Sequence, residues 1–143
     1  MGVEEERTVL LALDPGETTG FAVMHMTPVR TRRDFPELVC TGTLSLWRGV
    51  EKLIREHRPR VVVYEKFLLY PWKAREQSFS AMSAAQVVGA IEEICERHAL
   101  HVVGQSAATG KGVRLSPEKK AEIHNRHAID AYCHGVAYLR TLE

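Results

Sequence analysis

The sequence has no long apolar run, and this absence sets the first limit on what the protein can be. Its hydrophobic stretches fall well short of the roughly 20 apolar residues that a membrane-spanning helix needs. The first residues have neither the basic segment nor the apolar core of a signal peptide, and Glu6 stands where a myristoylation motif requires serine or threonine. We therefore expect a cytoplasmic protein with no membrane partner.

Cysteine is scarce as well, and the three that occur are far apart, at Cys40, Cys95 and Cys133. An odd number without a CxxC pair indicates neither a disulfide framework nor a zinc knuckle, so we expect small buried hydrophobic residues. Structural zinc is a weaker hypothesis, because the potential ligands late in the chain lack the paired spacing typical of tetrahedral sites. These potential ligands are His124, His127, Cys133 and His134.

An excess of either charge is also missing, since the formal net charge is only +1. The glutamates at positions 4 to 6, however, fall in an expected tail, and three further carboxylates are candidate metal ligands. When these acids are set aside, lysine and arginine outnumber the remaining acidic residues. A basic working surface suits a polyanionic partner such as nucleic acid.

The length of 143 residues and the 45% hydrophobic content predict one globular domain, residues 1–143, with one core. A short apolar run over 8–13 ends in an Asp-Pro-Gly turn, which is typical of a buried strand. β-favouring residues over 18–26 and alternating residues over 38–46 predict two more strands. Three sequential strands of this kind indicate an antiparallel meander.

The rest of the chain alternates between helices and strands. The expected elements are helices over 47–57, 80–98 and 116–142, strands over 60–65 and 101–105, and a flexible loop over 106–115. The apolar side of the long helix comprises Met82, Val87, Ile91, Ile94 and Cys95. Ser116 and Pro117 are typical of the start of the last helix. The order βββαβαβα predicts an α/β fold, with a mixed sheet of five strands flanked by helices.

Acidic side chains fall at the ends of two predicted strands. Asp14 ends the first strand and Glu65 the fourth, at the edge where open α/β sheets form their sites. His127 and Asp130 stand three apart on the final helix and so share one of its faces. Taken singly, Asp14 could belong to a simple turn and the helical pair to a solvated surface. Taken together, the positions indicate a common site.

These residue types suit hydrolysis of a phosphodiester, whose own negative charge repels nucleophiles. Carboxylates are hard oxygen ligands that hold Mg²⁺ or Mn²⁺. Two such cations, about 4 Å apart, activate water on one side of the phosphate and stabilise the leaving oxygen on the other. We therefore interpret Asp14, Glu65, His127 and Asp130 as the catalytic and metal-binding residues of a nuclease.

Three segments carry a family resemblance: LALDPGETTGFAVM with Asp14, VVVYEKF with Glu65, and HAIDAYCHGVAYL with His127 and Asp130. They resemble the first acidic strand and its hairpin, the second acidic strand and the last helix of the RuvC-type Holliday junction resolvases, which are RNase H-like nucleases. The resemblance covers nearly the whole chain in the same order. It implies an RNase H-like fold, a two-metal site at these four residues, and a homodimer that resolves four-way DNA junctions in recombination and repair.

The sequence also departs from that family. Many members carry an acid where His127 stands, although a histidine variant exists, so the departure concerns the metal preference. The chain is shorter than cellular resolvases, as in compact phage enzymes, which indicates a bacterial or phage-infected cytoplasm. Family members dimerise across the central helix, where small residues here would permit close approach; ordinary packing of helix on sheet explains them equally well. These residues are Ala81, Ala84, Ala85, Gly89 and Ala90.

Basic and aromatic residues outside the acidic site are candidates for DNA binding. Phosphate contacts are the hypothesis, and a solvated surface the alternative, for Arg30, Arg32, Arg33, Lys73, Arg75, Lys111 and Arg114. Stacking on unpaired bases is the hypothesis for Phe67, Tyr70 and Trp72. Core packing is the alternative for Phe67. The segment GQSAATGK lacks the spacing and the final Ser or Thr of a phosphate loop, so no nucleotide cofactor is expected.

Two other functions fit the same residues. One is an RNase H-like nuclease acting on flap DNA or on an RNA–DNA hybrid, which cleavage assays across substrates would separate. The other is a non-catalytic nucleic-acid-binding module of the same fold, recognised by metal-independent binding without cleavage. Sugar kinases and actin-like ATPases begin with a similar hairpin, but they need two such domains and a far longer chain.

Overall fold

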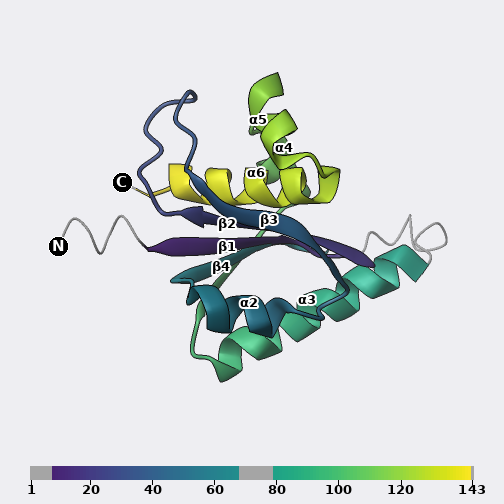
Figure 1. Ribbon diagram of the computed structural model, residues 1–143. Coiled ribbons are helices and arrows are strands. Elements are labelled where there is room, and N and C mark those ends of the chain that lie inside the picture. The colour runs from purple at the N-terminus through teal and green to yellow at the C-terminus, as the bar shows by residue number, and fades with distance from the viewer. Residues whose placement is uncertain (1–7, 68–78, 143) are drawn as a thin grey trace.

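The computed structural model describes residues 8–67 and 79–142, which form a five-stranded sheet with helices on both faces (Figure 1). The strands are β1 (Val9–Asp14), β2 (Thr18–His25), β3 (Leu38–Ser45), β4 (Val61–Glu65) and β5 (His101–Gln105). The helices are α2 (Val50–His57), α3 (Phe79–Arg97), α4 (Ala107–Lys111), α5 (Pro117–Ile123) and α6 (Arg126–Arg140). The predicted α/β fold with a mixed sheet is confirmed.

The sheet has the order β3-β2-β1-β4-β5 and combines both kinds of pairing. β1 pairs antiparallel with β2, and β2 with β3, as the meander predicts. β4 pairs parallel with β1, and β5 pairs parallel with β4. Because β1 and β4 are parallel neighbours, their C-terminal ends lie at the same edge of the sheet.

The central strand β1 is apolar because helices cover both of its faces. Leu10 and Ala12 belong to a core shared with α6, while Leu11 and Leu13 belong to a second core shared with α2 and α3. Figure 1 shows α6 on one side of the sheet and α2 and α3 on the other. Burial on both sides makes β1 a firm support for the residue at its end.

Helix α6 lies directly on β2 because two glycines leave room for it. A Cβ added at Gly20 would overlap the backbone carbonyl of His127, and one added at Gly135 would overlap the thioether of Met24. Any side chain at Gly20 would therefore push the start of α6 away from the sheet. Gly20 is the register partner of Asp14, so this close contact brings His127 beside the end of β1.

The chain after β5 differs from the prediction. The segment predicted as a flexible loop contains the short helix α4, and the predicted final helix is in fact two helices, α5 and α6. The break falls at His124, whose φ of 73° lies in the left-handed region. Asn125 then caps α6 by accepting hydrogen bonds from the backbone N–H groups of His127 and Ala128. The residues on either side of the break favour helix, so the sequence pattern alone predicts no interruption. The predicted helix start is confirmed, since Ser116 caps α5.

Two predictions about burial also need correction. Met82 is 62% exposed, because the buried side of α3 begins only at Val87 within the described residues. Cys40 is half-buried, whereas Cys95 and Cys133 are buried as predicted. Within the same described ranges, no helix has both the length and the hydrophobicity that crossing a membrane requires.

Candidate active site

Two carboxylates stand side by side at the C-terminal edge of the sheet. Asp14 is the last residue of β1, and Glu65 is the last residue of β4. The parallel register pairs Leu13 with Tyr64, which sets Asp14 level with Glu65. The side chain of Asp14 is 16% exposed and that of Glu65 is 32% exposed, so both reach solvent only in part. The strand ends therefore meet as the sequence predicts.

The beginning of α6 adds a histidine and a third carboxylate. Nδ1 of His127 lies 3.9 Å from Oδ2 of Asp14. Asp130 stands one turn later and lines a cavity of about 400 Å³ together with Glu65. Asp14 and His127 do not line this cavity, but they lie beside each other, and the charges of Glu65 and Asp130 act on Asp14.

The pKa values of Asp14 and Asp130 are raised, first by burial and then by neighbouring negative charges. Burial, followed by the charges of Glu65 and Asp130, raises the pKa of Asp14 from its usual 3.8 to about 7. Burial, followed by the charge of Glu65, also raises the pKa of Asp130. The charge of His134 opposes both increases. Like charges held this close favour a bound cation or a shared proton.

The donor set fits a hard divalent cation. Carboxylates supply oxygen ligands of the kind that Mg²⁺ and Mn²⁺ prefer, and an imidazole nitrogen suits Mn²⁺ better than Mg²⁺. A cation would also relieve the repulsion that raises the pKa of Asp14. Within the residues that the structure describes, no three such groups lie close enough to hold an ion at once. The four side chains therefore lie in one region of the sheet edge but do not form a closed set of ligands.

Two polar residues beside Glu65 are absent from the predicted site. Nε2 of His134 lies 3.0 Å from Oε1 of Glu65. Nδ1 of the same ring lies 2.9 Å from Oε1 of Gln105, which pairs with Glu65 across the sheet. His134 follows Asp130 by one helical turn, so its spacing was a usable signal. Its contact with Glu65, however, depends on how α6 lies on the sheet.

The residues of the zinc hypothesis point to different partners. His127 faces Asp14, and His134 faces Glu65. The Cys133 thiol donates to the backbone carbonyl of Val113, with sulfur and oxygen 3.9 Å apart. Burial raises the pKa of that thiol to about 11, so it stays protonated at neutral pH. A metal in this region would therefore meet carboxylates and imidazoles rather than a thiolate.

Two of the predicted DNA contacts stand beside the acids. Lys111, at the end of α4, and Arg114, just after it, line the same cavity as Glu65 and Asp130. Lys120 of α5 also lines it and was not predicted. Cationic and anionic side chains therefore share one cavity.

A second group of predicted DNA contacts lies at the opposite end of the sheet. The chain enters their loop from His25 at the end of β2, which pairs with Val9 at the start of β1. Figure 1 shows this loop near the C-terminal end of α6, away from the edge where β1 ends. The residues concerned are Arg30, Arg32 and Arg33, all exposed. The structure does not bring them to the acidic site.

The remaining candidates divide between described and undescribed residues. Phe67 is half-buried and follows Glu65 closely. Tyr70, Trp72, Lys73 and Arg75 lie outside the described residues. On α3, Ala85 and Gly89 are exposed, and a Cβ added at Gly89 would meet nothing within 4 Å. Packing against the sheet therefore does not explain these two small residues.

Comparison with known proteins places the fold. The sequence matches no protein-family model and no curated protein. Thermus thermophilus RuvC in complex with a Holliday junction substrate matches in structure with a TM-score of 0.66 and 15% identity, over 94% of this chain and 96% of that one. A second Thermus thermophilus RuvC structure matches with a TM-score of 0.65 and 14% identity, over 91% and 92%. The chain therefore has the RuvC fold, the RNase H-like α/β architecture that the sequence resemblance implied.

Proposed function

We propose that the protein is a divalent-metal-dependent endonuclease that cuts four-way DNA junctions by paired nicks. The observation that carries this proposal is the meeting of Asp14, Glu65 and Asp130 at one edge of a RuvC-like sheet. Their burial and mutual repulsion raise the pKa of Asp14, which is typical of a functional site rather than a structural ion pair. The cavity lined by Glu65 and Asp130 also carries positive side chains, which suit a phosphate-bearing substrate.

Each residue of the site has a distinct part in this proposal. Asp14, Glu65 and Asp130 would bind Mg²⁺ or Mn²⁺ through their carboxylate oxygens. His127, which lies 3.9 Å from Asp14, would be a further ligand or would orient the attacking water. The cations, when bound, supply activation of that water and stabilisation of the leaving oxygen. The two strands hold their carboxylates in a fixed relation while the substrate enters.

The placement of basic residues favours a large substrate. Lys111, Arg114 and Lys120 would contact phosphates next to the cleaved bond. The exposed arginines of the loop after β2 lie at the other end of β1, whose 6 residues span roughly 20 Å. A nucleic acid that contacts both groups has to extend past the sheet, as the diverging arms of a junction would.

Branched DNA and a dimer have separate supports. The solved neighbour is a RuvC bound to a Holliday junction substrate, which favours the same class of substrate here. For a homodimer, the support is the exposure of Ala85 and Gly89 on α3, since small residues let a second helix approach closely. Two sites related by a dimer axis would cut two strands, which accounts for paired nicks.

Cleavage of labelled nucleic acids tests the proposal. The protein is incubated with a four-way junction, a flap, linear duplex, single-stranded DNA and an RNA–DNA hybrid, each with Mg²⁺, Mn²⁺ or EDTA. We expect paired nicks in the junction with either metal and none in EDTA, with Asp14→Asn as the isosteric control. Faster cutting of the flap or hybrid would support the other nuclease function. Metal-independent binding without any cutting would overturn the enzymatic proposal.

A further inference from the structure

A buried histidine holds one oxygen of Glu65. His134 of α6 is 1% exposed, and its Nε2 lies 3.0 Å from Oε1 of Glu65. A carboxylate oxygen accepts hydrogen bonds and cannot donate them, so the imidazole N–H donates. Because Oε1 already accepts this hydrogen bond, Oε2 is the oxygen that keeps both lone pairs for a ligand.

The far side of the imidazole ring is anchored as well. Its Nδ1 lies 2.9 Å from Oε1 of Gln105, which is itself only 9% exposed. A side-chain amide can accept from Nδ1–H, or turn over and donate to Nδ1, so it holds the ring in either case. Gln105 pairs with Glu65 across β4 and β5. The series Glu65, His134 and Gln105 therefore ties α6 to both strands.

Helix α4 closes over the same ring. A Cβ added at Gly110 would lie 2.7 Å from Nε2 and 2.9 Å from Cε1 of His134. A larger residue at Gly110 would therefore displace the imidazole, and the ring cannot turn out of its place without moving α4. A polar side chain enclosed on every side is held in one orientation, as the support of a functional carboxylate needs to be.

We infer that His134 is a positioning residue: it fixes the Glu65 carboxylate through Oε1, so that this acid enters the metal centre through Oε2. The inference rests on the proposed function, because it concerns the same carboxylate. Hydrogen bonds that orient metal-binding carboxylates change metal affinity by about 10- to 100-fold when they are removed. His134 itself remains outside the ligand set.

Mn²⁺ binding to substituted proteins tests this role. His134→Leu removes both hydrogen bonds with little change in volume, whereas His134→Gln keeps an amide N–H that can donate to Glu65. Tyr132→Phe is the matched control, because Tyr132 is buried on the same helix and its hydroxyl donates to the carbonyl of Pro36 over 2.7 Å. The dissociation constant is obtained from the electron paramagnetic resonance signal of free Mn²⁺, and the unfolding temperature is recorded in EDTA.

We expect His134→Leu to weaken Mn²⁺ binding by about 10- to 100-fold and His134→Gln to recover most of the loss. Tyr132→Phe should lower stability and leave the affinity unchanged. Equal affinity in wild type and His134→Leu would overturn the inference, whatever happens to cleavage. If His134→Leu fails to fold, the ring ¹⁵N chemical shifts of His134 are compared between wild type and Glu65→Gln. A difference supports the hydrogen bond between His134 and Glu65, and identical shifts refute it.

Cleavage of a four-way junction, assayed on the same samples, separates the two proposals. A wild-type protein that binds Mn²⁺ but cuts nothing contradicts the proposed function, while the comparison of affinities still decides the role of His134. A wild-type protein that takes up no Mn²⁺ overturns both.

Discussion

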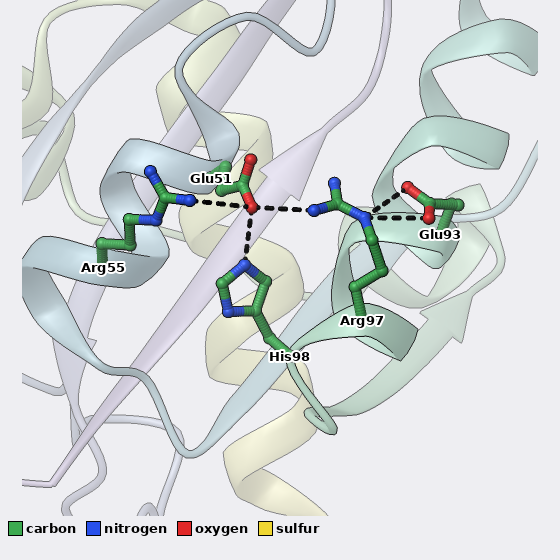
Figure 2. A network of polar contacts seen from close by, with 5 residues as sticks. All are labelled: Glu51, Arg55, Glu93, Arg97 and His98. Carbon is green, nitrogen blue, oxygen red and sulfur yellow. Dashed lines mark hydrogen bonds and ion pairs between the residues drawn. The ribbon is translucent and has the colours of Figure 1, made fainter.

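Glu51 and Asp14 are both carboxylates on the described part of the chain, but the charges around them differ in sign. Glu51 of α2 is the centre of a polar network with residues of both helices on its face of the sheet (Figure 2). Its Oε2 accepts from Nε2 of His98 over 2.7 Å and from Nη1 of Arg97 over 3.0 Å. These contacts, with His98 first, lower the pKa of Glu51. Arg97 also donates to Glu93, so the network joins α2 to the end of α3.

Asp14 has the opposite environment. Burial and the charges of Glu65 and Asp130 raise its pKa to about 7, so the ionised group is held at a cost to the fold. A protein keeps such a cost mainly where activity needs it, since stabilising substitutions at functional sites usually reduce function. A carboxylate paired with arginine therefore indicates architecture, whereas crowded carboxylates that repel one another indicate a place for a cation.

The largest expected effect is on cleavage. Asp14→Asn should lower the rate of junction cutting by about 100-fold or more, because it removes a metal-binding charge at little steric cost. Glu65→Gln and Asp130→Asn should act likewise, and combinations should add little because all three serve one transition state. Single-turnover kinetics measure the rate, and a gel shift checks that junction binding survives. Glu93→Gln, in the paired network, is the control and should cut normally. Retention of more than a few per cent of the activity by Asp14→Asn would end the assignment.

A smaller effect is expected on the choice of metal. His127→Asp should raise activity with Mg²⁺ relative to Mn²⁺, because an oxygen ligand replaces the softer imidazole nitrogen. The measurement is the ratio of cleavage rates in the two metals, for wild type and variant. His57→Asn, in α2 and far from the acids, is the matched control. An unchanged ratio in His127→Asp would remove His127 from the metal centre.

Binding should distinguish the two ends of the sheet. Lys111→Ala, beside the acids, should weaken binding of all DNA substrates and reduce the salt slope of the affinity by about one. Arg32→Ala, at the opposite end, should weaken junction binding more than duplex binding, because the proposed contacts at this end are made by a second arm of the junction. Titrations at several salt concentrations measure both quantities. Equal losses on junction and duplex for Arg32→Ala would contradict the two-ended contact.

Stability should change with opposite sign at the two carboxylates. Since the pKa of Asp14 is raised from 3.8 to about 7, the folded state binds more protons and loses stability as pH rises through that window. Asp14→Asn should therefore raise the unfolding temperature in EDTA at pH 8 by roughly 3 to 6 °C, and by little at pH 4. Added Mg²⁺ should stabilise wild type more than the variant. Thermal scans at the two pH values measure this difference. A lower unfolding temperature for Asp14→Asn than for wild type at pH 8 would contradict the unfavourable environment of the ionised Asp14 carboxylate.

The smallest effect is expected at Glu51. Its pKa is lowered from 4.5, so its contribution to stability is present above that value and is lost as pH falls through the folded-state pKa. Glu51→Gln should therefore lower the unfolding temperature slightly at pH 7, with the difference fading in acid, because exposed ion pairs contribute little. Cleavage should stay normal. A loss of cleavage in this variant would mean that the network serves the active site as well.

The sheet and its acidic edge could be predicted because they depend on local patterns. Apolar runs mark β1 and β4, and a strand ends where its pattern ends, so the positions of Asp14 and Glu65 at the two strand ends could be predicted without knowledge of tertiary contacts. That β1 and β4 are parallel neighbours was only a condition at the level of the sequence, and the structure supplies it. The spacing of His127 and Asp130 predicted that they lie on one helix, and both lie on α6, which begins later than predicted.

The parts that escaped prediction depend on contacts across the fold. The close approach of α6 to β2 requires Gly20 to meet His127, which are far apart in sequence. The break before α6 follows from a cap at Asn125, a residue that also occurs in loops. The role of His134 follows from its burial against Glu65, which spacing along one helix does not reveal.

Anomalous diffraction from crystals grown with Mn²⁺ tests the central claim most directly. We expect anomalous density between the carboxylates of Asp14, Glu65 and Asp130, and its loss in Asp14→Asn crystals. We expect none beside Glu51, whose charge is already paired. Absence of density at the sheet edge in crystals that hold Mn²⁺ elsewhere would contradict a metal centre there, and with it the proposed nuclease.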